Sequence, residues 1–157
     1  MKAIVLLLSS ASILFGVMTR DAARETVYDD RTHLTWADDA NASSQMKNWS
    51  DAIDYCEALE LADRRDWRLP NINELLSIVD LSRSNPAVFH VFLHTAGWGY
   101  WSSTTWRNGA GTHAWYTDFE NGPANASYKT DSCYVRCVRG GFPVPAFLPA
   151  VLLQLLE

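Results

Sequence analysis

The chain has 157 residues, of which 48% are hydrophobic and 20% are charged, and its formal net charge is −5. This length and composition suit one soluble globular domain with its own hydrophobic core. The acidic balance, without any run of Lys or Arg, argues against nucleic acid and anionic membrane surfaces as partners, because both bind basic patches.

Residues 1–24 resemble an export segment. Met1 and Lys2 give a short positive start, and an apolar run from Ala3 to Met18 follows. This is the pattern of a secretory signal peptide. We predict cleavage before about Glu25, with an uncleaved N-terminal membrane anchor or an N-terminal core helix as alternatives. The expected location is secreted, periplasmic or at the cell surface.

Residues 25–59 predict a hairpin and then a helix. Two β-prone stretches flank the polar turn at 29–33, which favours a hairpin over residues 25–37. Asn48 with Asp51 then marks a helix start. Apolar residues recur at helical spacing through Cys56 to Leu59, so Cys56 should face the core.

The stretch from Asp66 to Leu76 predicts a fixed change from extended chain to helix. Trp67 and Leu69 are expected to be buried on either side of Arg68. Pro70 ends the extended segment, and Asn71 with Glu74 forms a capping box for a helix over 72–81.

The second half predicts mainly strands. A short helix is expected over 88–93, followed by strands over 100–105 and 113–119, each ended by a glycine-containing turn. Tyr128 should open a further stretch that ends in an alternating strand over 133–139. The domain then ends at Gly141, and residues 142–157 form an apolar tail with three prolines.

The three cysteines, Cys56, Cys133 and Cys137, predict one disulfide and one unpaired thiol in an oxidising compartment. In a strand, Cys133 and Cys137 would lie about 13 Å apart, which is beyond disulfide reach. Cys56 is therefore expected to pair with one of them. A Cys-x-x-x-Cys metal pair is the alternative, and it lacks nearby ligands of suitable spacing.

No pattern for catalysis is evident. Ser102 and Ser103 lack the setting of a nucleophile, and their hydroxyls are expected to bond to backbone. His90 and His94 lie four apart but lack the glutamate of a metalloprotease helix. We therefore expect no enzyme activity, no cofactor and no metal site.

Several blocks occur in an order that resembles the Lcl C-terminal domain family. They are Thr35-Trp36, the helix from Trp49 to Leu59, Asp66-Trp67-Arg68-Leu69-Pro70 with Glu74-Leu75, Tyr100-Trp101-Ser102-Ser103-Thr104, and the closing run from Tyr134 to Gly140. The resemblance covers roughly Thr26 to Gly141.

The resemblance implies an exported bacterial protein with an α+β, C-type-lectin-like fold, in which two helices flank small twisted antiparallel sheets. It also implies a disulfide between Cys56 and Cys137, which leaves Cys133 unpaired. Residues of the matching blocks are expected to stabilise this fold, namely Trp67, Arg68, Leu69, Pro70, Glu74, Trp101, Ser102 and Arg136.

The calcium motifs of lectins with this fold are absent from the chain. Asp118, Glu120 and Asn121 offer oxygen atoms but lack the paired motif. The chain also lacks the basic cluster that a sulfated glycan would require.

The function that these features favour is a binding or adhesion module for a carbohydrate or protein ligand. Its ligand is expected to meet the long loops, where aromatic rings stack on sugars and polar side chains bind hydroxyls. The residues expected to bind it are Trp106, Tyr116, Asp118, Glu120 and Asn121.

Two alternatives remain. The first is a structural subunit of a surface assembly, a homo-oligomer in which the apolar tail inserts into a neighbour. Membrane contact would involve only the N-terminal segment or the tail. The second is an oxidase resembling formylglycine-generating enzymes, which would need two neighbouring reactive cysteines and fails if Cys56 and Cys137 are joined.

Overall fold

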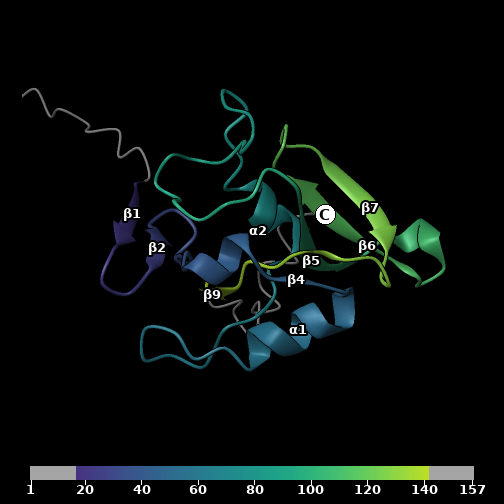
Figure 1. Ribbon diagram of the computed structural model, residues 1–157, viewed down its shortest axis with the longest axis horizontal. Helices are drawn as coiled ribbons and strands as arrows, with labels where there is room; N and C mark the ends of the chain where they lie inside the picture. Colours follow the sequence, from purple (N-terminus) through teal and green to yellow (C-terminus); the bar gives the residue numbers. More distant parts are fainter. Residues whose placement is uncertain (1–16, 142–157) are drawn as a thin grey trace, which may run out of the picture.

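The computed structural model describes residues 17–141 and shows an α+β arrangement of two sheets and two short α-helices (Figure 1). The tail predicted for residues 142–157 and the first 16 residues of the leader predicted for residues 1–24 lie outside the described residues. The elements are β1 Met18–Asp21, β2 Thr26–Asp29, β3 Leu34–Ala37, η1 Ala40–Ser43, β4 Met46–Lys47, α1 Trp49–Glu57, α2 Ile72–Leu76, β5 Gly99–Thr105, η2 Arg107–Gly109, β6 His113–Asp118, β7 Ala124–Tyr128, β8 Cys133–Tyr134 and β9 Val138–Gly140.

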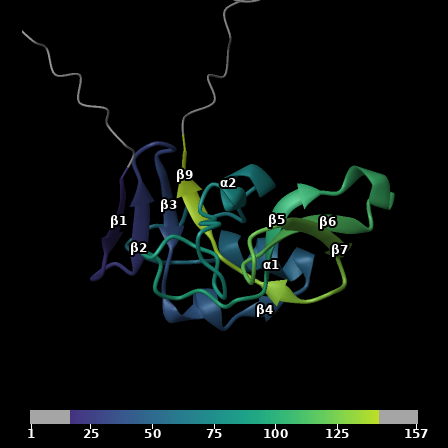
Figure 2. The same ribbon diagram turned by 90° about the horizontal axis from the view of Figure 1, so that it is seen from above.

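The two sheets lie at opposite ends of the molecule (Figure 2). The first has the order β1-β2-β3-β9 and is antiparallel throughout, and it contains the predicted hairpin. The second has the order β4-β8-β5-β6-β7. Its β5 and β8 run parallel and meet at Tyr100 and Tyr134, so the expectation of purely antiparallel sheets is wrong for this pair.

Strand β1 falls in the segment that the sequence assigns to a leader or anchor. It pairs with β2 over its whole length, from Met18 opposite Asp29 to Asp21 opposite Thr26. Within the described residues, the folded domain therefore begins before Glu25, the predicted boundary. The strand could not be recognised in the sequence, because Val17 and Met18 continue the apolar run of the predicted leader.

Helix α1 begins as predicted, because the Asn48 side chain accepts a hydrogen bond from the Asp51 backbone N–H. The predicted capping box of α2 is also present, with Asn71 and Glu74 each bonding the other's backbone N–H. However, α2 ends at Leu76 rather than at 81. Val79 instead forms a β-bridge with Val88, which suits β-branched residues better than a helix does.

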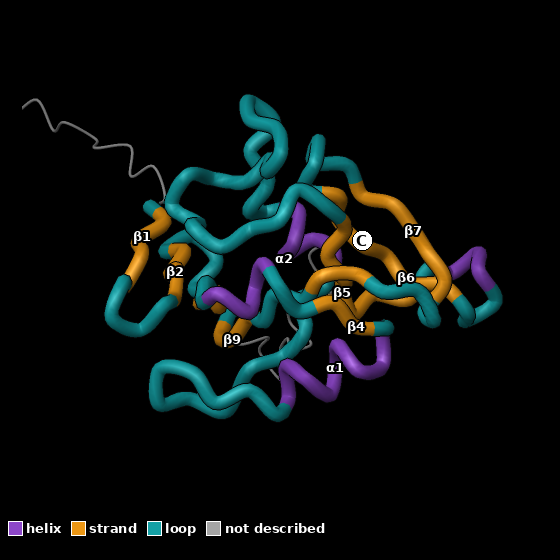
Figure 3. The backbone as a smooth tube through the Cα atoms, in the orientation of Figure 1, coloured by secondary structure: helices purple, strands orange, loops and turns teal. Residues whose placement is uncertain are grey.

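The predicted short helix over 88–93 is wrong. Residues 77–98 form a long connection between α2 and β5 that contains no helix (Figure 3). Val88 and Phe92 are buried in the core that this connection covers, and Val88 extends in the bridge to Val79. Tertiary packing thus outweighs the local helical spacing.

The predicted strand over 133–139 divides into β8 and β9, which belong to different sheets. Its predicted alternation persists through the break. Cys133, Val135 and Cys137 enter one core cluster, with Ala52 and Trp101. Val138 enters the other, with Val27, Trp36, Leu75 and Tyr100. One segment therefore connects both halves of the core.

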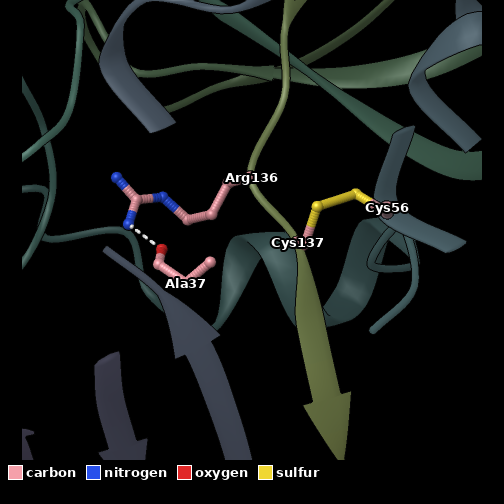
Figure 4. Close-up of a disulfide and its surroundings, with 4 residues drawn as sticks. All are labelled: Ala37, Cys56, Arg136 and Cys137. Carbon is pink, nitrogen blue, oxygen red and sulfur yellow. Dashed lines mark hydrogen bonds between the residues drawn. A yellow bond between two sulfur atoms is a disulfide. The ribbon is translucent and has the colours of Figure 1, made fainter. Parts of the chain in front are cut away.

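Arg136 and Cys137 extend to opposite sides of this segment (Figure 4). Cys137 forms a disulfide with Cys56 of α1, and the two Cα atoms lie 5.4 Å apart. Cys133 is free and buried. This is the pairing that the family resemblance implies.

Arg136 belongs to a buried ion network with Asp38 and Arg20. Arg136 and Asp38 are both 0% exposed, and the Arg136 Nη1 atom lies 3.0 Å from Asp38 Oδ1. Arg20 of β1 donates from Nε to Asp38 Oδ2 at 3.0 Å. The long connection joins this network, since Asp38 accepts from the N–H groups of Leu93 and His94.

Among residues 17–141, no helix has the length and apolar character that crossing a membrane requires.

Candidate functional site

The Trp67–Glu74 stretch forms a joint between β9 and α2. Trp67 and Leu69 are buried in the core cluster of α1. Arg68 pairs with Val138 through its backbone, and its guanidinium bonds both carboxylate oxygens of Glu74, at 2.8 and 2.6 Å. Glu74 also accepts from Asn71 N–H at 2.8 Å, so its carboxylate joins Arg68, which pairs with β9, to the first residues of α2.

These contacts shift the pKa values of both Glu74 and Arg68. Burial alone would raise the pKa of Glu74, but hydrogen bonds from Arg68 and from the Asn71 backbone outweigh it and hold this pKa below its ordinary value of 4.5. The same bond from Glu74 raises the pKa of Arg68. A hollow of about 580 Å³ lies beside the pair. The charged groups that line it are Arg68 and Glu74, and they are hydrogen-bonded to each other.

Trp101 and Ser102 are fully buried in β5. The Trp101 indole donates to the Lys47 carbonyl at 3.0 Å, and the Ser102 hydroxyl donates to the Trp115 carbonyl at 2.7 Å. The Ser102 hydroxyl therefore bonds to backbone, as expected, and joins β5 to β6.

Four rings gather on one side of β6 and β7. His113 and Trp115 share a side of β6 because strand side chains alternate. Tyr128 of β7 lies opposite His113, with ring centroids 4.1 Å apart. Trp106, just after β5, lies edge-on to His113 at 5.4 Å and to Trp115 at 6.4 Å. We call this group, Trp106, His113, Trp115 and Tyr128, the aromatic face.

Helix α2 covers only the inner part of this side of the sheet. Tyr100 and Thr117 pair there and are buried, with Leu75 of α2 in the same core cluster as Tyr100. Farther out, the rings are only partly buried, and Tyr128 is 58% exposed. Opposite Trp115, β7 carries the small residue Ala126. The outer part is thus a partly exposed ring surface.

The η2 turn fixes the orientation of His113. The Thr112 hydroxyl donates to the Gly109 carbonyl at 2.6 Å and contacts His113 Nδ1 at 2.8 Å. A hydroxyl has one hydrogen, so Nδ1 must donate to Thr112, and the tautomer with hydrogen on Nδ1 leaves Nε2 as an acceptor. A Cβ on Gly109 would lie 2.6 Å from Nδ1, so glycine is required for this close packing.

The five residues predicted to bind ligand do not form one site. Trp106 belongs to the aromatic face. Tyr116 points to the other side of β6, where it meets Trp101 edge-on at 6.0 Å. Burial, followed by the nearby Asp118 and Cys133, raises the pKa of Tyr116. Asp118 begins the turn at the far end of β6, about 17 Å along the strand from His113.

Asp118 and its neighbours build that turn. Asp118 Oδ1 accepts from Glu120 N–H at 2.9 Å, and its carbonyl accepts from Gly122 N–H at 2.7 Å. Glu120 and Asn121 are exposed. Within residues 17–141, no cluster of three or more His, Cys, Asp or Glu side chains could hold a metal ion.

Sequence reasoning missed His113, Trp115 and Tyr128 as members of a shared surface. The alternation from His113 to Trp115 was available as a signal, since it places both rings on one side of a strand. The pairing of Tyr128 with His113 was not available, because β7 ends at Tyr128, whereas the pattern predicts that Tyr128 opens the stretch that leads to the strand over 133–139.

Cys133 lacks the environment of a reactive thiol. It is buried beside Tyr116 and Gly99, and burial, with smaller effects from Asp131 and Asp118, raises its pKa to about 12. The thiolate that acts as a nucleophile is therefore scarce at neutral pH.

Comparison with known proteins supplies one finding. A family model described as the Lcl C-terminal domain matches residues 25–139, from the start of the β2 hairpin into β9. The matched region contains the disulfide, the Arg68–Glu74 pair and the whole aromatic face. No curated protein matches the chain.

Proposed function

The chain belongs to the Lcl C-terminal domain family, and from this membership we propose that it is an exported bacterial binding module that recognises a carbohydrate. The ligand lies against the aromatic face at the outer end of β6 and β7. Recognition there is by stacking and hydrogen bonding and involves no covalent step.

The observation that carries this proposal is the partial exposure of four adjoining rings on one side of a sheet. Rings with an apolar surface and a polar edge suit ligands that are part apolar and part hydrophilic, as the faces of sugar rings are. Tyr128, the most exposed of the four, contributes both a ring and a hydroxyl. The His113 Nε2 atom offers an acceptor for a sugar hydroxyl.

The η2 turn adds polar groups beside the rings. Arg107 and Asn108 are exposed and directly follow Trp106. Their side chains supply donors that rings lack, and a few such groups beside an apolar surface fix a ligand's orientation. The net charge of −5 favours a carbohydrate over nucleic acid here.

The proposed binding is independent of calcium. The oxygen-bearing residues Asp118, Glu120 and Asn121 lie at the other end of β6 from the rings, and Asp118 is engaged in its own turn. A chelator is therefore expected to leave affinity unchanged.

We further propose that the fold is C-type-lectin-like and that the chain matures in an oxidising compartment. The pairing of β9 with β3 supports the fold, because it brings the last strand beside an early hairpin. The disulfide between α1 and the residue before β9 supports both proposals. With that disulfide formed and Cys133 buried, the chain offers little support for an oxidase that needs two reactive cysteines.

A glycan array with the full chain, with and without a chelator, tests this function. The variants Tyr128→Ala and Trp115→Ala should each weaken binding by about tenfold or more, as central aromatic contacts do. Trp98→Ala is the matched control, because Trp98 is 56% exposed but precedes β5 at the opposite end of the sheet.

Two results would overturn the proposal. One is an array without any bound glycan for a folded protein. The other is binding that Trp98→Ala abolishes while Tyr128→Ala leaves it unchanged, which would move the ligand to the other end of the sheet.

A further inference from the structure

A second surface lies on the four-stranded sheet, away from the aromatic face. It is an apolar groove of about 430 Å³ where β1 begins, and we call it the β1 groove. Its lining residues are Val17, Met18, Arg31, Phe89, His90 and Val91.

The walls of the β1 groove are fixed by the fold. Met18, Phe89 and Val91 pack against the first core cluster, so the groove floor is continuous with the core. Backbone hydrogen bonds from Asp30 N to Val17 O and from Phe89 N to Ile78 O hold its two sides. Val17 is nevertheless 56% exposed. A preformed apolar surface of this kind favours an apolar occupant.

We propose that residues 142–157 of the same chain fold back and occupy the β1 groove. The tail leaves the domain at Gly141, next to the pairing of Gly140 with Leu34. The β1 groove lies at the same end of this sheet, where Met18 pairs with Asp29. The described chain thus ends at the same end of this sheet as the start of β1 (Figure 2).

The distance is short for the length of the tail. Three strand spacings separate β9 from β1, because the order is β1-β2-β3-β9. At about 4.8 Å each, this crossing is roughly 14 Å. About five extended residues span it, since each covers about 3.3 Å. The remaining residues of the tail, from about Phe147 onward, are then available to fill the groove.

Composition matches the tail to the groove. The tail is apolar along most of its length, and Glu157 is its only charged side chain. The groove walls are largely apolar, and Arg31 at the rim is already paired with Asp29, 3.6 Å away. Burial of apolar tail residues against these apolar walls is therefore the interaction that would hold the tail in the groove.

Disulfide trapping in the full chain tests the proposal. His90→Cys places a thiol at the exposed wall of the groove, and it is combined in turn with Phe147→Cys, Val151→Cys or Leu155→Cys in the tail. Mild oxidation at low protein concentration should cross-link at least one pair within a single chain, as mass spectrometry and a non-reducing gel would show. Ser84→Cys, exposed on the same long connection but outside the groove, is the matched control for His90→Cys.

Dimers cross-linked between chains would overturn the proposal in favour of a second copy as the occupant. Absence of cross-linking in all three pairs, or equal cross-linking with Ser84→Cys, would overturn it altogether.

A labelling experiment tests the occupant independently. The alkylation rate of His90→Cys should rise about tenfold when Leu148→Asp and Leu152→Asp are added to the full chain, because charged side chains destabilise an apolar contact. The buried Cys133 gives the background rate, measured in the parent. A rise with Ile13→Asp and Phe15→Asp instead would identify the N-terminal segment as the occupant and reject the tail.

Discussion

The buried ion network and the aromatic face differ in how far they are buried and in the kind of contact that holds their side chains. In the network, Asp38 and Arg136 are fully removed from solvent, and Asp38 accepts from Arg136, from Arg20 and from the backbone of the long connection at Leu93 and His94. In the aromatic face, the rings belong to one hairpin and its neighbouring strand, contain no ion pair, and remain partly exposed. From this difference we expect changes in the network to cost more stability than changes in the aromatic face.

The strongest test of this contrast is Asp38→Asn. It leaves the Arg136 guanidinium buried without its counter-charge, and we expect the free energy of unfolding to fall by about 3–5 kcal/mol. Urea denaturation would measure this loss. Asp63→Asn, at an exposed turn, is the control and should change little. A loss below about 1 kcal/mol for Asp38→Asn would mean that the network is not a main contributor to the stability of the fold.

Removal of the disulfide should have the next largest effect. Replacement of both Cys56 and Cys137 by Ala opens a loop with a sequence separation of 81 residues. The expected loss is about 2–5 kcal/mol, mainly because the unfolded chain gains freedom. Chemical denaturation of the double variant against the oxidised parent measures it, and equal midpoints would contradict the expectation.

Glu74→Gln should cost about 1–3 kcal/mol at neutral pH, because Arg68 loses its charged partner. The folded protein holds the pKa of Glu74 below 4.5, so this carboxylate stabilises the fold above that pH. Its contribution is lost as the pH falls through the lowered folded value. Urea titrations at pH 7 and at about pH 3 should therefore show the gap between parent and variant narrowing in acid, and a gap that widens would contradict this assignment.

Tyr128→Ala should have the smallest effect on stability, within about 0.5 kcal/mol, because the ring is largely exposed. Thermal unfolding of the variant would check this beside its glycan binding. A loss of stability as large as that of Glu74→Gln would mean that the aromatic face belongs to the core and not to a binding surface.

The sequence predicted the parts of the fold that depend on short-range chemistry. Asn71 and Glu74 mark a helix start because their bonds are local, and Trp67 and Leu69 are buried as their spacing predicts. Cys56 faced the core by helical spacing, although only the family resemblance selected Cys137 over Cys133 as its partner. Elements whose form depends on distant partners were predicted less well.

Residues 77–98 illustrate this limit. Val79 leaves the helical path because Val88 is available to pair with it, and neither residue signals the other in the sequence. The five residues predicted to bind a ligand are divided between places for a related reason. Trp106 and Tyr116 are both aromatic and close in sequence, but the alternation of side chains along β6 places Tyr116 on the side of the sheet away from Trp106. The pairing of Tyr128 with His113 depends on the register between β6 and β7, which the sequence does not reveal.

The position of the disulfide has a consequence for the order in which the protein is made. Of the three cysteines in this sequence, Cys137 is synthesised after Cys56 and Cys133, and Cys133 precedes it by four residues. In an oxidising compartment Cys56 therefore meets a competing thiol before its native partner exists. In the folded domain, the division of residues 133–138 between two sheets leaves Cys133 buried and places Cys137 against α1. Correct oxidation thus has to wait for the C-terminal end of the domain, and premature oxidation should trap chains joined through the wrong cysteine.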